Sequence, residues 1–237
     1  MKTESEQPVE EPQPQPNPDL PADPPAEKPE TYTVDQMENI ILGNDFDKTD
    51  CNLSQFQKLK LRIRTKKKGT KYSVELTWKK IKGADGYIIY GAKCGNKMKK
   101  ITTIRKGDTT KWVQKNRKKG TYYKYLVVAY KGNDVITASK AVHATTPDGK
   151  KGNPVGITNV KKTKVTLKDG KKYQLKAKVK TNRPYAVHVA ELRYESANTD
   201  IATVNKKGMI SAKKAGVTNV YIYTQNGISK TIKVTVQ

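Results

Sequence analysis

The longest apolar, aromatic-rich run of the chain follows a turn, in the segment Gly120-Thr-Tyr-Tyr-Lys-Tyr-Leu-Val-Val-Ala-Tyr130. Aromatic and β-branched side chains favour the pleated, half-buried surface of a β-strand. Charged, turn-forming segments lie on both sides of this run and predict its two ends. We therefore predict a central strand at residues 122–130, in which alternate residues face a core: Tyr123, Tyr125, Val127 and Ala129.

Short alternating segments around this strand predict an antiparallel sandwich. Residues 59–64 and 74–79 alternate apolar with polar or charged side chains. Further short strands are predicted at 87–90, at 101–104, from 112 onward and at 135–144. Period-two alternation places one face of a strand on a core and the other in water. Seven such strands, with turn signals between them, are what a β-sandwich over residues 56–146 requires.

A second alternating region follows a segment rich in glycine, proline and lysine, which predicts a linker at 147–156. Residues 172–180 alternate apolar with lysine and other polar side chains, and Asn226-Gly227 is a hairpin signal between two apolar strands. We predict a second sandwich over 157–237. The expected fold class is all-β, with two tandem antiparallel β-sandwiches.

The N-terminal part has a different composition. Up to Glu30 it contains nine prolines, eight acidic residues and no apolar periodicity, which predicts a disordered acidic tether over residues 1–32. Residues 33–55 are predicted to form a short helix and a loop. Thr33-Val-Asp-Gln36 fits a capping box, and Met37, Ile40 and Ile41 follow at helical spacing. So short a helix is expected to dock its apolar stripe on the following sandwich.

The first sandwich contains motifs of a known family: Leu76-Thr-Trp78, Gly83-Ala-Asp-Gly-Tyr-Ile-Ile-Tyr90, Lys119-Gly-Thr-Tyr-Tyr-Lys-Tyr125 and Val127-Val-Ala-Tyr130. Together they resemble a bacterial fibronectin type III domain over about residues 56–146. The resemblance implies structural roles for Trp78, Tyr87 and Tyr123. Tyr123 matches the family's corner tyrosine, whose hydroxyl bonds back to the backbone. One departure is Arg117, at a position where the family usually has leucine.

The second sandwich is similar to the group 2 bacterial immunoglobulin-like domain over about residues 157–237. The resemblance is carried by the runs at 196–204, 207–212, 215–218 and 232–236, which include Ser-Ala-Asn-x-x-Ile-Ala-Thr-Val and Ile-Lys-Val-Thr-Val. The segment at 182–191 is longer than a minimal hairpin and is the least predictable loop of this domain.

The charge divides sharply along the chain. Residues 1–50 contain 3 Lys/Arg and 13 Asp/Glu, net −10, so the remainder carries 44 against 9, net +35, which gives the overall +25. Such a charge favours any dense polyanion: nucleic acid, an anionic wall polymer, acidic glycans or a membrane surface. The lysine clusters fall mainly at turns and outward strand positions, which equally suits a soluble surface. No interleaving of aromatic and basic residues on one face is demonstrable, so we expect no specific nucleic-acid partner.

The sequence does not assemble a catalytic or cofactor site. His143 and His188 lie in different predicted domains, and Cys94 has no histidine near it in sequence. Each histidine is expected to be a surface or strand-end residue, and Cys94 a small half-buried one. We predict no catalytic residue, no metal and no cofactor. In an exported protein Cys51 could pair with Cys94 in a disulfide, although two cysteines are not a disulfide framework.

Sugar binding would use exposed aromatic side chains, because a flat ring can stack on a sugar face. The candidate ligand contacts are Trp112, Tyr185 and His188, with Tyr122 and Tyr130 as further aromatic candidates. Sandwich domains bury most such rings, so core positions are the competing interpretation for the aromatic residues.

Domains of these families occur in bacterial surface and secreted proteins as spacers, adhesive modules and accessories of catalytic domains. The first hypothesis is a monomeric, non-catalytic extracellular or cell-surface module that contacts anionic wall polymers. The alternative is a carbohydrate-binding accessory region of a larger secreted glycoside hydrolase, and a third is a cytoplasmic nucleic-acid binder. The sequence predicts no membrane span, and Met-Lys-Thr-Glu-Ser-Glu lacks the apolar stretch of an export signal. We therefore expect that signal to lie outside this chain.

Overall fold

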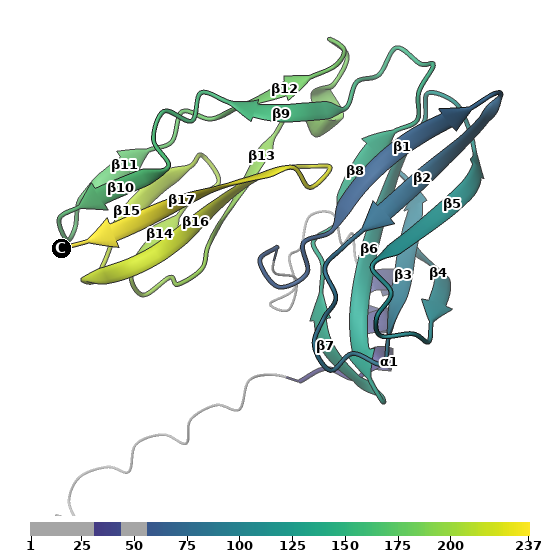
Figure 1. The fold of residues 1–237 in the computed structure, drawn as a ribbon, viewed down its shortest axis with the longest axis horizontal. Helices are drawn as coiled ribbons and strands as arrows, with labels where there is room; N and C mark the ends of the chain where they lie inside the picture. Colours follow the sequence, from purple (N-terminus) through teal and green to yellow (C-terminus); the bar gives the residue numbers. More distant parts are fainter. Residues whose placement is uncertain (1–30, 44–55) are drawn as a thin grey trace, which may run out of the picture. The chain divides into compact units, whose positions relative to one another are not determined.

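The computed structural model describes residues 31–43 and 56–237, and residues 31–237 form one compact unit (Figure 1). The described part is almost entirely β-structure, which confirms the predicted fold class. It contains one α-helix, α1 (Val34–Gly43), and one 3-10 helix, η1 (Val187–Val189). Most of the tether predicted over residues 1–32, and the loop predicted after the helix, lie outside the described residues. Within the described ranges, no helix has the length and apolar character needed to cross a membrane.

The first sandwich consists of two antiparallel sheets (Figure 1). One sheet has the order β1-β2-β5 and the other the order β4-β3-β6-β7, with β8 also paired to β6. Their bounds are β1 (Arg62–Lys68), β2 (Lys71–Thr77), β3 (Gly86–Lys93), β4 (Lys99–Ile104), β5 (Lys111–Arg117), β6 (Tyr122–Lys131), β7 (Asp134–Ala138) and β8 (Val142–Thr145).

Two strand predictions need correction. The segment predicted as one strand at 135–144 is two strands, β7 and β8, which pair with opposite ends of the long β6. Ser139 lies at the break, where its backbone N–H donates to the Val127 carbonyl and its hydroxyl accepts from the Val127 N–H. The strand predicted at 59–64 begins only at Arg62, although Leu59 and Leu61 are buried as the alternation requires.

The core between these sheets contains the predicted face of β6: Tyr123, Tyr125, Val127 and Ala129. Trp78 and Tyr87 pack together there, with ring centroids 5.1 Å apart. The Tyr123 hydroxyl accepts a hydrogen bond of 3.0 Å from the Lys118 N–H, which is the return to the backbone expected of a corner tyrosine. The Arg117 guanidinium lies over the Tyr123 ring, 5.4 Å from its centroid, so it packs where the family usually has leucine.

The helix α1 docks on the outer face of β6, as predicted. Met37 and Ile41 are fully buried against Leu126 and Val128, which point away from the main core. The capping box is present, since the Gln36 N–H donates to the Thr33 hydroxyl over 3.2 Å and the Thr33 N–H donates to the Gln36 side chain over 2.9 Å. The sequence pattern placed only alternate residues of β6 on a core, and the structure buries residues 122–129 on both faces of the strand.

The second sandwich has sheets of order β10-β17-β16-β13, β11-β15-β14 and β12-β9 (Figure 1). Its strands are β9 (Pro154–Thr158), β10 (Lys164–Leu167), β11 (Lys172–Gln174), β12 (Lys178–Thr181), β13 (Leu192–Ser196), β14 (Ala202–Val204), β15 (Met209–Ala212), β16 (Gly216–Thr224) and β17 (Ser229–Val236). Its core is a separate cluster that includes Ile210, Ile222 and Val234. The predicted hairpin joins β16 to β17, and Gly227 supplies its positive φ of 85°.

One pairing of the second sandwich departs from the predicted antiparallel arrangement. Strand β10 runs parallel to β17, with Val165 opposite Val234. Parallel neighbours need a long connection, and here most of the domain lies between the two strands. Alternation alone cannot specify this pairing, because it marks the faces of a strand and not its partner.

The two sandwiches contact each other through the tip of the β16–β17 hairpin. The Ile63 N–H donates to the Asn226 carbonyl over 3.2 Å, and the His143 N–H donates to the Gln225 carbonyl over 2.8 Å. The Phe56 ring stacks on the Tyr223 ring with centroids 4.2 Å apart and planes at 5°. These contacts give the junction both directional hydrogen bonds and apolar packing.

The linker is also fixed by specific hydrogen bonds. The Asn153 amide accepts from the Thr145 N–H and donates to the Thr145 carbonyl, both over 2.8 Å. The Asn226 amide donates to the Pro154 carbonyl over 2.9 Å, so the hairpin tip holds the end of the linker as well.

Candidate functional site

The loop at 182–191 packs on the first sandwich. Its residues Ala186 and Val189 are buried against Tyr122, at the start of β6. The Tyr122 hydroxyl donates over 2.6 Å to the Gly152 carbonyl, and burial raises the pKa of this phenol. The outer face of β6 is therefore covered at one end by α1 and at the other end by this loop.

Three side chains with metal-ligating atoms meet beneath the loop. Cys94 follows β3, His143 lies in β8 and His188 lies in η1. The Cys94 Sγ is 3.5 Å from the His143 Nδ1, and this Nδ1 is 3.1 Å from the His188 Nε2. All three ligand atoms lie within 4.8 Å of one another.

The sheet register explains why Cys94 and His143 are close. Strands β3 and β8 both pair with the first part of β6, where His143 lies opposite Lys124 and Lys93 lies opposite Tyr123. The Cys94 N–H continues this pairing with a 3.0 Å bond to the Tyr122 carbonyl. His143 is near the beginning of its strand, as expected, but its side chain is buried, whereas His188 is exposed.

A cavity of about 520 Å³ lies beside this cluster. Its lining includes Cys94, Tyr122, Tyr185, His188 and two lysines, Lys93 and Lys151. The Tyr185 side chain is 66% exposed and the neighbouring Val187 is 88% exposed, so an apolar surface stands next to cationic groups. Such a combination can stack on a flat ligand and attract an anionic one.

The structure separates the three ligand contacts predicted from sequence. Tyr185 and His188 line the same cavity, whereas Trp112 is half-buried and packs edge-on against Tyr125 with centroids 6.2 Å apart. The Trp112 ring therefore serves the core of the first sandwich. Cys51 lies outside the described residues, so its pairing with Cys94 stays a prediction.

Sequence reasoning missed the three-residue cluster. Cys94 and His143 are 49 positions apart, and His143 and His188 are 45 positions apart, far beyond the short spacings that mark metal motifs. The one useful signal was the unusual length of the loop at 182–191, which carries His188.

A second cavity, of about 980 Å³, lies in the second sandwich along β12, β13 and the turn before β15. Basic side chains predominate among the charged residues that line it: Lys178, Arg193, Lys206 and Lys207, with Glu191 as the acidic member. This arrangement is a cationic groove.

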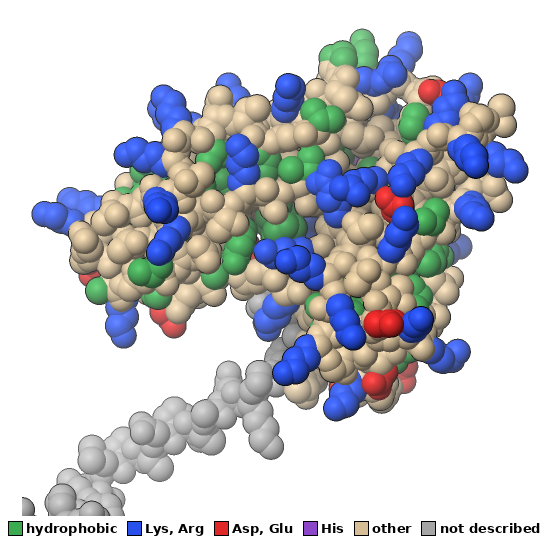
Figure 2. Space-filling view, viewed as in Figure 1, with side chains coloured by type: hydrophobic (Ala, Val, Ile, Leu, Met, Phe, Trp, Pro, Cys, Tyr) green, Lys and Arg blue, Asp and Glu red, His purple; other side chains and the backbone are tan. Residues whose placement is uncertain are grey.

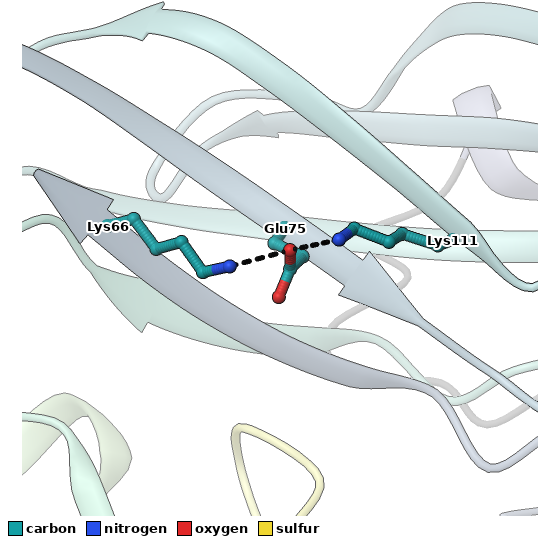
Figure 3. Close-up of polar contacts among 3 residues, drawn as sticks. All are labelled: Lys66, Glu75 and Lys111. Atoms are coloured by element: carbon teal, nitrogen blue, oxygen red, sulfur yellow. Dashed lines mark hydrogen bonds and ion pairs between the residues drawn. The ribbon is translucent and has the colours of Figure 1, made fainter. Parts of the chain in front are cut away.

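Lysine and arginine side chains are distributed over both sandwiches, with few acidic ones among them (Figure 2). Some of these acidic groups form ion pairs with lysines. The Glu75 carboxylate, whose side chain is 6% exposed, lies 2.8 Å from the Lys66 Nζ and 2.9 Å from the Lys111 Nζ (Figure 3). These hydrogen bonds lower the pKa of Glu75, and the surrounding surface stays strongly cationic.

Comparison with known families identifies the second sandwich. Residues 154–236 match the model of the bacterial Ig-like domain (group 2) family. The second sandwich is a group 2 bacterial Ig-like domain. This finding confirms the resemblance of residues 157–237, and the domain so matched contains the cationic groove and the loop that carries His188. No curated protein matches the chain with significance.

Several solved structures share a likeness with the chain. The two-domain fibronectin type III segment of chicken tenascin is 20% identical, with 72% of this chain and 97% of that chain covered and a TM-score of 0.31. Pectate lyase PelI from Erwinia chrysanthemi, in complex with tetragalacturonic acid, is 16% identical. The match covers 46% of this chain and 33% of the lyase chain, with a TM-score of 0.30. The surface-layer protein SbsC is 16% identical, and the match covers 76% of this chain and 35% of the SbsC chain, with a TM-score of 0.29. The chain thus spans about a third of the pectate lyase chain that it matches.

Proposed function

We propose that the chain is a non-catalytic module of a bacterial cell-surface or secreted protein, in which the two sandwiches act as a spacer and adhesion unit. The match of residues 154–236 to a bacterial Ig-like family supports this proposal. The first sandwich is proposed to be of the fibronectin type III kind. Its strand orders, β1-β2-β5 and β4-β3-β6-β7, and the hydrogen bond from Lys118 to the Tyr123 hydroxyl support that assignment.

The proposed ligand is an anionic polymer of the cell wall. The observation that carries this is the cationic groove of the Ig-like domain, in which Lys178, Arg193, Lys206 and Lys207 gather around one cavity. The net charge of +35 beyond residue 50, from 44 basic and 9 acidic residues, supplies a long-range attraction around it. A polymer of repeating negative charges releases counterions on binding, which favours association at low salt.

Retention on purified anionic wall material tests this proposal. We expect the chain to be retained at low salt and released at about 1 M salt, where the screening length falls to about 3 Å. Wall material from which the anionic polymer has been removed is the control surface. Retention that is unchanged at high salt would contradict the electrostatic part.

A pair of charge-matched variants tests the role of the groove. One carries Lys178→Gln, Lys206→Gln and Lys207→Gln, and the control carries Lys79→Gln, Lys80→Gln and Lys82→Gln at exposed positions of the first sandwich. Both lose three positive charges. The groove variant is expected to lose retention at a lower salt concentration than the control, and equal loss would assign binding to net charge alone.

The alternative is a carbohydrate-binding accessory region of a larger secreted glycoside hydrolase. The observation that favours it is Tyr185, a residue that is 66% exposed and lines the cavity at the junction. A glycan array would then show selective binding that Tyr185→Ala removes and Trp112→Ala leaves, because Trp112 packs on the core. A pure spacer binds no glycan selectively.

A further inference from the structure

The ligand atoms of Cys94, His143 and His188 have the spacing of a metal site. In a tetrahedral zinc centre, Zn–S bonds of about 2.3 Å and Zn–N bonds of about 2.0–2.1 Å place neighbouring ligand atoms about 3.3–3.6 Å apart. The Sγ–Nδ1 separation of 3.5 Å and the Nδ1–Nε2 separation of 3.1 Å already approach these values. The Sγ–Nε2 separation is at most 4.8 Å, so a small rotation of the exposed His188 ring would bring this third separation to the value expected for a zinc centre.

From this geometry we propose that Cys94, His143 and His188 bind one Zn²⁺ at the junction of the two sandwiches. One thiolate and two neutral imidazoles form a donor set that suits zinc. The His143 Nδ1 faces both other ligand atoms, and a ring nitrogen is either a donor or an acceptor at one time. A cation at the centre can accept a lone pair from all three atoms at once.

The ligands are positioned by bonds that do not depend on a metal. The Cys94 N–H is held by the Tyr122 carbonyl, and the His143 N–H is held by the Gln225 carbonyl of the hairpin tip. The His188 ring packs against the Tyr122 ring with centroids 4.9 Å apart. Because the backbones of Cys94 and His143 are fixed separately and the His188 ring is already packed at the site, we expect binding to require mainly adjustment of side-chain torsions.

The site joins two domains and leaves one position open. Cys94 and His143 belong to the first sandwich and His188 to the Ig-like domain, so a bound zinc ion would link them. Three protein ligands leave the fourth position of a tetrahedral ion to water or to an exogenous group from the neighbouring cavity. Lys93 and Lys151 line that cavity and Lys124 lies opposite His143 in the sheet. The positive charges of these three lysines partly disfavour the binding of a dication, and the negative charge of the Cys94 thiolate offsets this effect. The same lysines favour an anionic group as the fourth ligand.

Metal titration of the whole reduced chain tests the proposal. The protein, freed of metal and kept with a reductant that does not bind zinc, is titrated with Zn²⁺ by calorimetry and with Co²⁺ by absorption spectroscopy. We expect one equivalent of each ion. Tetrahedral cobalt with a thiolate ligand is expected to show visible d–d bands and a sulfur-to-cobalt charge-transfer band in the near ultraviolet.

Substitution of each ligand identifies the site. Cys94→Ser, His143→Ala and His188→Ala are each expected to weaken Zn²⁺ binding at least about tenfold, because even outer groups of metal sites contribute that much. His188→Ala is the most informative variant, since His188 is the exposed member of the three and its substitution is expected to disturb the fold least. Tyr185→Ala, in the same cavity but without a ligand atom, is the matched control and should bind Zn²⁺ as the parent does.

Three results would overturn the proposal. The first is the absence of Zn²⁺ binding by the reduced parent chain. The second is unchanged affinity and an unchanged charge-transfer band in the Cys94→Ser and His188→Ala variants, which would place any bound ion elsewhere. The third is a Cys51–Cys94 disulfide in the intact mass of the exported protein, because that bond consumes the thiolate.

Discussion

Replacement of Gly227 by alanine tests whether the hairpin tip is docked as the structure shows. A Cβ at this position would lie 2.2 Å from the Leu61 carbonyl oxygen, a backbone atom of the other sandwich. Gly170, in the same domain, is the matched control, because its φ of 70° resembles the 85° of Gly227 and nothing lies within 4 Å of a Cβ there. Both substitutions carry the left-handed cost of about 1–2 kcal/mol, and only Gly227→Ala adds a clash.

The size of the additional effect follows from what the clash displaces. When the tip moves away, the hydrogen bonds that Ile63 and His143 donate to it are lost, at about 1 kcal/mol each. The stacking of Phe56 on Tyr223 is weakened as well, at about 0.5–1.5 kcal/mol. We therefore expect Gly227→Ala to lower the free energy of unfolding by about 3 kcal/mol more than Gly170→Ala does.

Denaturant unfolding followed by two probes measures this difference. Both tryptophans, Trp78 and Trp112, lie in the first sandwich, so their fluorescence reports that domain alone, whereas far-ultraviolet circular dichroism reports both. The two transitions should coincide in the parent chain and separate in Gly227→Ala. If the two glycine variants differ by less than about 0.5 kcal/mol, and the probes still coincide, the docked junction is wrong.

Three further substitutions test single elements by the same denaturation assay. Tyr123→Phe removes the acceptor of the Lys118 N–H and should cost about 1–3 kcal/mol, so a neutral result would deny the hydroxyl its structural role. Met37→Ala empties a fully buried position between α1 and β6 and should cost about 2–5 kcal/mol, and a loss below about 1 kcal/mol would mean that the helix is not docked. Glu75→Gln should cost up to about 1 kcal/mol, because its lysine partners are more than half exposed. Folding lowers the pKa of Glu75, so the stability that Glu75→Gln removes should be fully present above about pH 4.3 and should disappear as the pH falls through the folded-state pKa. A loss of stability that does not change with pH would contradict the ion-pair account.

Local patterns in the sequence were enough to predict most of the individual elements. The alternation of β6 predicted which of its residues face the core, and the Thr33–Gln36 pair predicted the reciprocal hydrogen bonds that begin α1. The Asn226-Gly227 dipeptide predicted the hairpin between β16 and β17. These features depend on residues close together in the chain, so their physical basis is visible in the sequence.

Other features depend on which elements meet. The burial of both faces of β6 requires α1 and the loop at 182–191 to cover it, and the parallel pairing of β10 with β17 requires the rest of the domain to lie between them. The continuous apolar run of β6 is compatible with burial of both faces, but neither sequence shows which element covers or pairs with the strand, because an apolar residue looks the same whichever partner buries it.

The candidate site is one of the features that depend on which elements meet. The sequence by itself determined two β-sandwiches with lysines facing outward, and it supplied one cysteine and two histidines in segments with no metal-binding spacing. Only the tertiary structure decided that β3 and β8 flank β6, and that the loop of the other domain places His188 over both, which brings three ligand atoms within 4.8 Å. The physical reason is that local sequence specifies strands and turns, whereas a site assembled across domains depends on the packing of those strands against each other.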